Sequence, residues 1–268
     1  MLRTIERLSV FYNWGPAVPF PAARVAEAAD VWLTAEVGVE LHAAFYECPD
    51  EYRRLPAEQS PVVLFFHGNA GSIRRWRHIG SRWQDALGAD VLVLDYRGYG
   101  RSSGTPTEAG LYIDARAAYE YLTQDRAVDP ERIVIVGQSL GGGVAVNLAH
   151  DSAHAALVLE STFTRLTEVP SARLPWLPTE RWMRNRFGSI DLLSQYLKPL
   201  FVSHGDRDWL IPYAHAERLV EATAGPVEFM TLPGMNHSDR RPPEYNERVR
   251  RFLAEHLPQF RGLGESDD

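Results

Sequence analysis

The chain lacks several features on which other protein classes depend. Its single cysteine, Cys48, can form neither an internal disulfide nor a thiolate zinc site, which favours a reducing compartment. Its 28 basic residues are outnumbered by 35 acidic ones, so no basic surplus indicates a nucleic acid or an anionic membrane as partner. No apolar run reaches the roughly 18 residues of a membrane span. Arg3, Glu6 and Arg7 interrupt the stretch in which a secretory signal would be apolar. We therefore expect a cytoplasmic protein without a transmembrane segment.

What remains is the composition of an ordinary soluble globular protein, with 45% hydrophobic and 24% charged residues. Residues 30–257 are predicted to form one domain, and the sequence leaves the oligomeric state open. Residues 1–29 have no clear role, although the spacing of Leu2, Ile5, Leu8 and Phe11 is typical of a packed helix. Residues 258–268 are predicted to be a solvated C-terminal tail.

Short β-branched runs alternate with longer amphipathic stretches through most of the chain. The predicted strands are Pro61–Phe66, Val91–Asp95, Ile133–Val136, Ala156–Glu160, Leu200–Ser203 and Val227–Thr231. The predicted helices are Ile73–Leu87, Thr107–Gln124, Gly142–His150, Tyr213–Thr223 and Glu244–His256. Strands that are apolar on both faces and alternate with helices predict an α/β fold, a mostly parallel sheet with helices on both faces. Residues 30–48 alternate apolar and polar side chains and predict an antiparallel edge hairpin.

One segment, residues 163–198, breaks this alternation and is called the lid segment below. It holds five arginines and two tryptophans but no clear strand. Either it is a long connection across the edge of the sheet, or it is a short lid inserted over a site, since long loops in compact domains are often functional. We favour the lid. Its aromatic residues Trp176, Trp182, Phe187 and Tyr196 are candidates to line an acyl pocket, with Trp176 and Trp182 foremost, while most of its arginines solvate the outer face.

The pattern Gly-x-Ser-x-Gly occurs twice, around Ser102 and around Ser139. A nucleophile in such a turn needs a strand that leads directly into it and a helix that begins directly after it. Ser139 meets both conditions, because the strand Ile133–Val136 ends directly before Gly137 and small residues typical of a close-packed helix start follow. Ser102 lies further from its strand, because Arg97 to Tyr99 separate the strand from Gly100, and a Thr-Pro pair follows instead of a helix. The sequence therefore predicts Ser139 as the nucleophile and a flexible loop around Ser102.

A serine hydroxyl needs a base to take its proton, and the base needs an acid to orient it. In hydrolases with this turn the three groups follow in the order serine, acid, histidine. Of the histidines near the end of the chain, His215 and His256 lie within predicted helices, whereas His237 follows a strand directly in a loop. His237 is therefore the predicted base. Asp206 and Asp208 both follow the preceding strand, and Asp208 is the predicted acid because it has more reach toward the next loop.

Before the predicted nucleophile, the strand Pro61–Phe66 leads into the glycine-rich turn His67-Gly68-Asn69. Such a turn can present a backbone N–H to an oxyanion, together with the N–H of the residue after the nucleophile. These donors are predicted to be the backbone N–H groups of Asn69 and Leu140. His67 itself is predicted to pack within the loop rather than to act as an acid or base.

Six strings carry a resemblance to a known family: HGNAG, LDYRGYGRSSG, GQSLGG, LESTF, HGDRDWLIP and PGMNH, in this order along the chain. Together they span about residues 30–257. The chain resembles the serine hydrolases of the α/β-hydrolase superfamily and is similar to the BEM46 and ABHD13/ABHD17-like group. The resemblance implies a catalytic triad of Ser139, His237 and Asp208, an oxyanion hole, no metal and no cofactor. Relatives include membrane-anchored depalmitoylases, but the sequence has no evident anchor or N-terminal cysteine cluster.

The predicted function is that of a serine hydrolase that cleaves a small-molecule carboxylic ester, or a thioester or amide, through an acyl-enzyme intermediate. One alternative is a peptidase that acts on short peptides or acylated amino acids. Such an enzyme often has acidic side chains near its site, and the sequence does not place Glu160 or Glu180. A second alternative is a binding protein that keeps the fold without turnover, against which the complete serine, acid and histidine set argues.

Overall fold

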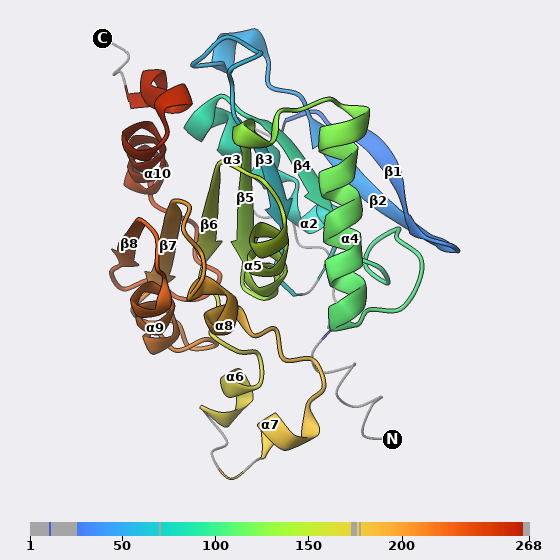
Figure 1. Cartoon of the computed structure of the whole chain (residues 1–268), viewed down its shortest axis with the longest axis vertical. Helices are drawn as coiled ribbons and strands as arrows, with labels where there is room; N and C mark the ends of the chain where they lie inside the picture. Colours follow the sequence, from blue (N-terminus) through green and yellow to red (C-terminus); the bar gives the residue numbers. More distant parts are fainter. Residues whose placement is uncertain (1–10, 12–25, 70, 173–175, 177, 265–268) are drawn as a thin grey trace.

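The computed structural model describes residues 11, 26–69, 71–172, 176 and 178–264. They form one eight-stranded sheet with the strand order β1-β2-β4-β3-β5-β6-β7-β8, with helices on both faces (Figure 1). The strands from β3 to β8 run parallel to one another, whereas β1 pairs antiparallel with β2, and β2 pairs antiparallel with β4. The predicted α/β fold is therefore confirmed, and residues 30–48 form the predicted antiparallel hairpin at the edge.

The strands are β1 Ala29–Glu36, β2 Val39–Tyr46, β3 Val62–Phe66, β4 Asp90–Leu94, β5 Ile133–Gln138, β6 Ala156–Glu160, β7 Leu200–Gly205 and β8 Val227–Leu232. The α-helices are α2 Ile73–Trp76, α3 His78–Leu87, α4 Glu108–Glu120, α5 Leu140–Asp151, α6 Glu168–Ser171, α7 Thr179–Trp182, α8 Ser189–Leu193, α9 Ala214–Ala222 and α10 Pro243–His256. Shorter turns are the 3-10 helices Asp50–Tyr52, Pro130–Arg132 and Pro258–Gly264 and the π-helix Tyr121–Asp125.

The core has two layers because the side chains of each buried strand alternate between the two faces of the sheet. In β5, Ile133 and Ile135 pack toward α4, α5 and α9, whereas Val134 and Val136 pack toward α3 and α10. Burial on both faces explains why the central strands contain almost only apolar residues. The catalytic candidates follow the carboxyl ends of β5, β7 and β8, which meet at one edge of the sheet.

The predicted helix Ile73–Leu87 is interrupted at Arg77, which separates α2 from α3. The apolar spacing continues through Arg77, with Ile73, Trp76 and Ile79 all in the same core layer, so the pattern contains no sign of the interruption. Asp95 contributes to the start of α2, because its Oδ1 accepts a 2.8 Å hydrogen bond from the backbone N–H of Ile73. That contact comes from a residue distant in sequence, and local periodicity does not reveal it.

The lid segment lies between β6 and β7 and contains α6, α7 and α8, which Figure 1 shows beyond the carboxyl ends of the strands. The predicted N-terminal helix falls on residues 1–10, outside the described residues, and Phe11 is buried with its ring edge-on to Phe187. The predicted C-terminal tail differs from the structure. Pro258–Gly264 is a 3-10 helix packed along α10, because Phe260 and Leu263 find apolar partners in the core layer of α3 and α10.

Candidate active site

Ser139 occupies a strained turn between β5 and α5. Its backbone angles are φ 54° and ψ −118°, a conformation that residues other than glycine rarely adopt. Neighbouring strands and loops hold the turn, since the Ser139 N–H donates to the Glu160 carbonyl at 3.0 Å and the Thr162 hydroxyl donates to the Ser139 carbonyl at 2.7 Å. A sharp strand-to-helix turn of this kind exposes the serine hydroxyl at the edge of the sheet.

The two glycines of the turn are required by close contacts. A Cβ at Gly137 would lie 2.4 Å from the carbonyl oxygen of Gly141, and a Cβ at Gly141 would lie 2.0 Å from the carbonyl oxygen of Phe66. Both distances are far below van der Waals contact, so any larger residue would push α5 away from the sheet. The Gly-x-Ser-x-Gly spacing thus follows from the packing of α5 against β5 and the end of β3.

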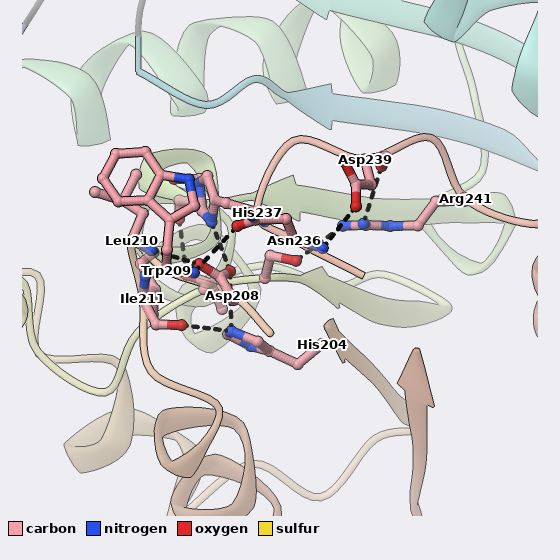
Figure 2. Close-up of polar contacts among 12 residues, drawn as sticks. His204, Asp208, Trp209, Leu210, Ile211, Asn236, His237, Asp239 and Arg241 are labelled. Atoms are coloured by element: carbon pink, nitrogen blue, oxygen red, sulfur yellow. Dashed lines mark hydrogen bonds and ion pairs between the residues drawn. The ribbon is translucent and has the colours of Figure 1, made fainter. Parts of the chain in front are cut away.

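His237 lies in the loop between β8 and α10 and reaches Ser139, 98 residues away in sequence. Its Nε2 is 3.0 Å from the Ser139 Oγ, and its Nδ1 is 2.7 Å from the Asp208 Oδ2. Because a carboxylate oxygen can only accept, the Nδ1 must carry a proton. In neutral His237 the Nε2 is then the acceptor for the Ser139 hydroxyl. Figure 2 shows His237 and Asp208 facing each other.

Asp208 has a fully buried carboxylate in the loop after β7. Its Oδ1 accepts hydrogen bonds from the backbone N–H groups of Leu210 and Ile211, both at 2.8 Å. Burial disfavours the charged carboxylate, but hydrogen bonds from His204 and His237 hold the pKa of Asp208 well below its ordinary value. Asp206, the rival acid, instead joins the loops after β7 and β8 by accepting a 2.6 Å hydrogen bond from the Gly234 N–H. Of the two aspartates, Asp208 is thus the one in contact with His237.

Asn236 connects the two loops that carry Asp208 and His237, and sequence reasoning did not single it out. Its side-chain oxygen accepts hydrogen bonds from the backbone N–H groups of His237 at 2.8 Å and Trp209 at 3.1 Å (Figure 2). The backbone N–H of Asn236 donates to the Asp239 carboxylate at 2.7 Å. One amide therefore sets the distance between neighbouring loops. Its position directly before the predicted base was the one available signal.

The loop between β3 and α2 lies beside Ser139, since a Cβ at Gly68 would be 3.2 Å from the Ser139 Cβ. The Tyr99 hydroxyl fixes the next residue by donating to the side-chain oxygen of Asn69 at 2.7 Å. Leu140 begins α5, where the first backbone N–H groups of a helix have no partner within the helix.

His67 is buried among aromatic rings with its Nδ1 2.7 Å from the Gly68 carbonyl oxygen, a packing position as predicted.

Ser102 lies in the loop after β4, where its hydroxyl ties that loop to β2. It donates to the Asp95 carbonyl at 2.6 Å and accepts from the His42 N–H at 2.9 Å. The Ser102 hydroxyl thus bonds to two backbone groups, whereas the Ser139 hydroxyl faces His237.

The aromatic residues of the lid segment divide into two groups. Trp176 is 75% exposed and Trp182 is 54% exposed. Phe187 and Tyr196 are buried instead. Phe187 packs edge-on against Tyr112, with ring centroids 5.6 Å apart, and the Tyr196 hydroxyl is 2.8 Å from the His154 Nε2. These two residues anchor the segment to the core, which leaves the tryptophans as the candidates for substrate contact.

Glu160, which the sequence did not place, is a buried structural charge at the end of β6. Its carboxylate pairs with Arg82 of α3 and accepts a 2.5 Å hydrogen bond from the Tyr245 hydroxyl of α10. Burial alone would raise the pKa of Glu160, but the charges of Arg82 and Arg241 lower that pKa to about 2. Because its carboxylate is fully buried and paired, Glu160 is not available to bind the amino group of a peptide.

We expect Arg82→Met to lower the free energy of unfolding by about 3–5 kcal/mol, because it leaves the Glu160 charge buried without its ion-pair partner. The double variant Arg82→Met/Glu160→Met removes both charges and should be considerably more stable than the single variant, since a buried ion pair can often be replaced by apolar side chains. Urea denaturation of the three proteins measures both changes. A double variant as unstable as Arg82→Met would contradict this reading of the pair.

Two further features are absent from the described residues. These residues hold no group of three or more histidine, cysteine, aspartate or glutamate side chains suited to a metal ion. None of their helices combines the length and hydropathy needed to cross a lipid bilayer.

A mostly parallel sheet with a serine in a strained turn after β5 is the architecture of the α/β-hydrolase class. A family model described as "alpha/beta hydrolase fold" matches residues 61–189. The chain is 31% identical over 231 residues to the α/β-hydrolase domain-containing protein WAV2 of Arabidopsis thaliana, with 78% of this chain and 72% of the relative covered. It is also 39% identical to an uncharacterized protein of Mycobacterium tuberculosis, with 93% and 87% covered. The chain belongs to the α/β-hydrolase family.

Solved structures show the same fold at lower identity. The Pyrococcus furiosus esterase Pf2001 is 22% identical, with a TM-score of 0.69, and the match covers 92% of this chain and 96% of the esterase. A puromycin-hydrolyzing peptidase of Mycobacterium tuberculosis is 21% identical, with a TM-score of 0.70, and the match covers 87% of this chain and 39% of the peptidase.

Proposed function

We propose that the protein is a serine hydrolase that cleaves a carboxylic ester of a small molecule through an acyl-enzyme intermediate. The observation that carries the proposal is the continuous series of contacts from the Ser139 Oγ to the His237 Nε2 at 3.0 Å and from the His237 Nδ1 to the Asp208 carboxylate at 2.7 Å. Nucleophile, base and orienting acid are each within hydrogen-bond distance of the next, as this chemistry requires.

In the proposed first step, His237 takes the proton of the Ser139 hydroxyl while the Oγ bonds to the carbonyl carbon of the substrate. Asp208 keeps the Nδ1 proton on the far side of the ring and stabilises the imidazolium that forms. His237 then gives its proton to the leaving alcohol as the ester bond breaks. A water molecule, activated by the same base, attacks the acyl-enzyme and releases the carboxylic acid, which restores the Ser139 hydroxyl.

The backbone N–H groups of Asn69 and Leu140 are proposed to stabilise the negative oxygen formed in both steps. The approach of Gly68 to the Ser139 Cβ brings the first of these residues near the nucleophile. Leu140 stands at the start of α5, directly after Ser139, which supports the second assignment and adds the positive end of the helix dipole. Donors held by the backbone need not reorganise as the charge develops, which makes them effective in the transition state.

A peptidase of short peptides or acylated amino acids is the second candidate, supported by the fold that the chain shares with the puromycin-hydrolyzing peptidase. The same serine mechanism serves both reactions. The burial of the Glu160 carboxylate with Arg82 favours the esterase, because it removes one acidic group that could have bound a peptide amino terminus. An exposed acid of the lid segment, Glu180, remains for that role.

The proposal is tested by reaction of the purified protein with a fluorophosphonate probe, which labels only an activated serine. Turnover is then measured with p-nitrophenyl esters of increasing acyl length, with a matched acyl thioester, and with a series of short aminoacyl amides. We expect labelling, and a kcat/KM higher for esters than for amides. Faster cleavage of the amides would favour the peptidase, and a protein without labelling or turnover would be a binding protein.

The exposed lid tryptophans are proposed to contact the acyl chain. We expect Trp182→Ala and Trp176→Ala to reduce kcat/KM for long acyl chains more than for acetate, because removal of a large apolar surface weakens the binding of long chains selectively. The matched control is Trp32→Ala, since Trp32 is 49% exposed on β1, outside the lid segment. If both lid variants keep the chain-length profile of the parent, the segment is only a connection.

A further inference from the structure

A second histidine, His204, contacts the Asp208 carboxylate from inside the fold. His204 is the last residue but one of β7, and its side chain is fully buried. Its Nε2 is 3.2 Å from the Asp208 Oδ2, the same oxygen that faces His237, and 2.9 Å from the carbonyl oxygen of Ile211 (Figure 2). The Asp208 oxygen therefore lies between two imidazole rings.

The surroundings of His204 fix which of its ring nitrogens carries a proton. Both neighbours of the Nε2, a carboxylate oxygen and a backbone carbonyl oxygen, can only accept hydrogen bonds. The Nε2 must therefore be protonated, and it donates to Asp208 and Ile211 together. The Nδ1 is buried and has no hydrogen-bond partner among the described residues, which suits an unprotonated nitrogen better than an unsatisfied N–H donor. The Tyr213 ring packs edge-on against His204, with ring centroids 6.1 Å apart, and holds its orientation.

The two oxygens of Asp208 are held by different groups. Backbone N–H groups of Leu210 and Ile211 hold the Oδ1. Apart from His237, the contact to the Oδ2 comes from His204. During attack His237 must keep its alignment with this oxygen while a positive charge forms on the ring. A donor on the far side of the Oδ2 limits rotation of the carboxylate and favours its charged form.

We propose that His204 is a positioning residue that aligns the Asp208 Oδ2 with His237 through its Nε2–H group. The inference rests on the proposed serine hydrolase function and extends the hydrogen-bonded series Ser139–His237–Asp208 by one residue into the core. His204 does not contact the substrate or exchange a proton with it. Its contribution is to the orientation of the acid, and through the acid to the rate of the chemical step.

The experiment compares His204→Met with His204→Gln, using a p-nitrophenyl ester and a fluorophosphonate probe. Methionine has a similar length but no N–H, whereas the glutamine amide can place an N–H near the position of the Nε2. We expect His204→Met to lower kcat about tenfold or more, with KM changed less than twofold and the labelling rate lowered in parallel, as for residues coupled in one hydrogen-bond network. His204→Gln should recover most of that loss.

A double-mutant cycle with Asp208→Asn separates positioning from general destabilisation. If His204 acts through Asp208, His204→Met should cause little further loss of kcat in the Asp208→Asn background. The control is His154→Met, because His154 is equally buried but lies before β6 and contacts Tyr196 and the Ser152 carbonyl. It should retain the parent kcat. The folded fraction of each variant is measured by near-ultraviolet circular dichroism. Each kcat is then calculated for the folded protein, so that loss of folded protein is corrected for.

The inference is overturned by an unchanged kcat in His204→Met, by equal losses in His204→Met and His204→Gln, or by fully additive losses in the cycle. In each of these cases the parent protein is still labelled at Ser139, and the proposed function stands. A parent protein that is neither labelled nor active overturns both.

Discussion

Ser139→Ala is expected to abolish labelling by a fluorophosphonate probe and to lower ester turnover by about 10⁴-fold or more, because it removes the atom that bonds to the substrate. Alanine should fit without loss of stability. The Ser139 hydroxyl bonds to His237, whereas the turn is held by backbone groups, including the bond from the Ser139 N–H to the Glu160 carbonyl. Probe labelling and initial rates, measured with protein of unchanged thermal midpoint, test the assignment.

Ser102→Ala is the matched control, since Ser102 is the serine of the other Gly-x-Ser-x-Gly pattern. Its hydroxyl joins the Asp95 carbonyl and the His42 N–H, so we expect a loss of stability on the order of 1 kcal/mol with labelling intact. Loss of labelling in Ser102→Ala, with labelling retained in Ser139→Ala, would reverse the assignment of the nucleophile.

Asp208→Asn is expected to reduce kcat by about 10²–10⁴-fold with little loss of folded protein. In an asparagine, an NH₂ group replaces one of the two carboxylate oxygens. This NH₂ faces either His237 and His204 or the two backbone N–H groups. If the NH₂ faces His237, the favoured tautomer changes and the Nε2 no longer accepts the Ser139 proton. If it faces Leu210 and Ile211, donor is set against donor and the loop that holds the acid is disturbed.

Asp206→Asn is the control for this prediction. Its side chain accepts from the Gly234 N–H of the loop after β8, and an asparagine oxygen can accept the same bond, so turnover should remain close to that of the parent. Steady-state kinetics of the two variants at matched thermal stability decide between the acids. A greater loss of turnover in Asp206→Asn would show that Asp206 orients His237.

Sequence patterns predicted the sheet because the features that define it are local. Each central strand is apolar on both faces, and this requirement follows from burial between two helical layers. The prediction was weaker where long-range contacts set the result. The helix Ile73–Leu87 is interrupted at Arg77, and Phe260 and Leu263 pack into the core where a solvated tail was expected.

The sequence by itself determined the strand-to-helix turn at Ser139, since Gly137 and Gly141 are needed wherever a helix packs this closely on a strand. It also determined that an acid and a histidine follow in loops after later strands.

Tertiary structure alone decided which aspartate contacts His237, because Asp206 and Asp208 are two residues apart and differ in the direction of their side chains. It alone brought His204 against Asp208 and paired Glu160 with Arg82, 78 residues away. Such contacts depend on the packing of loops and helices, which periodicity and spacing do not encode.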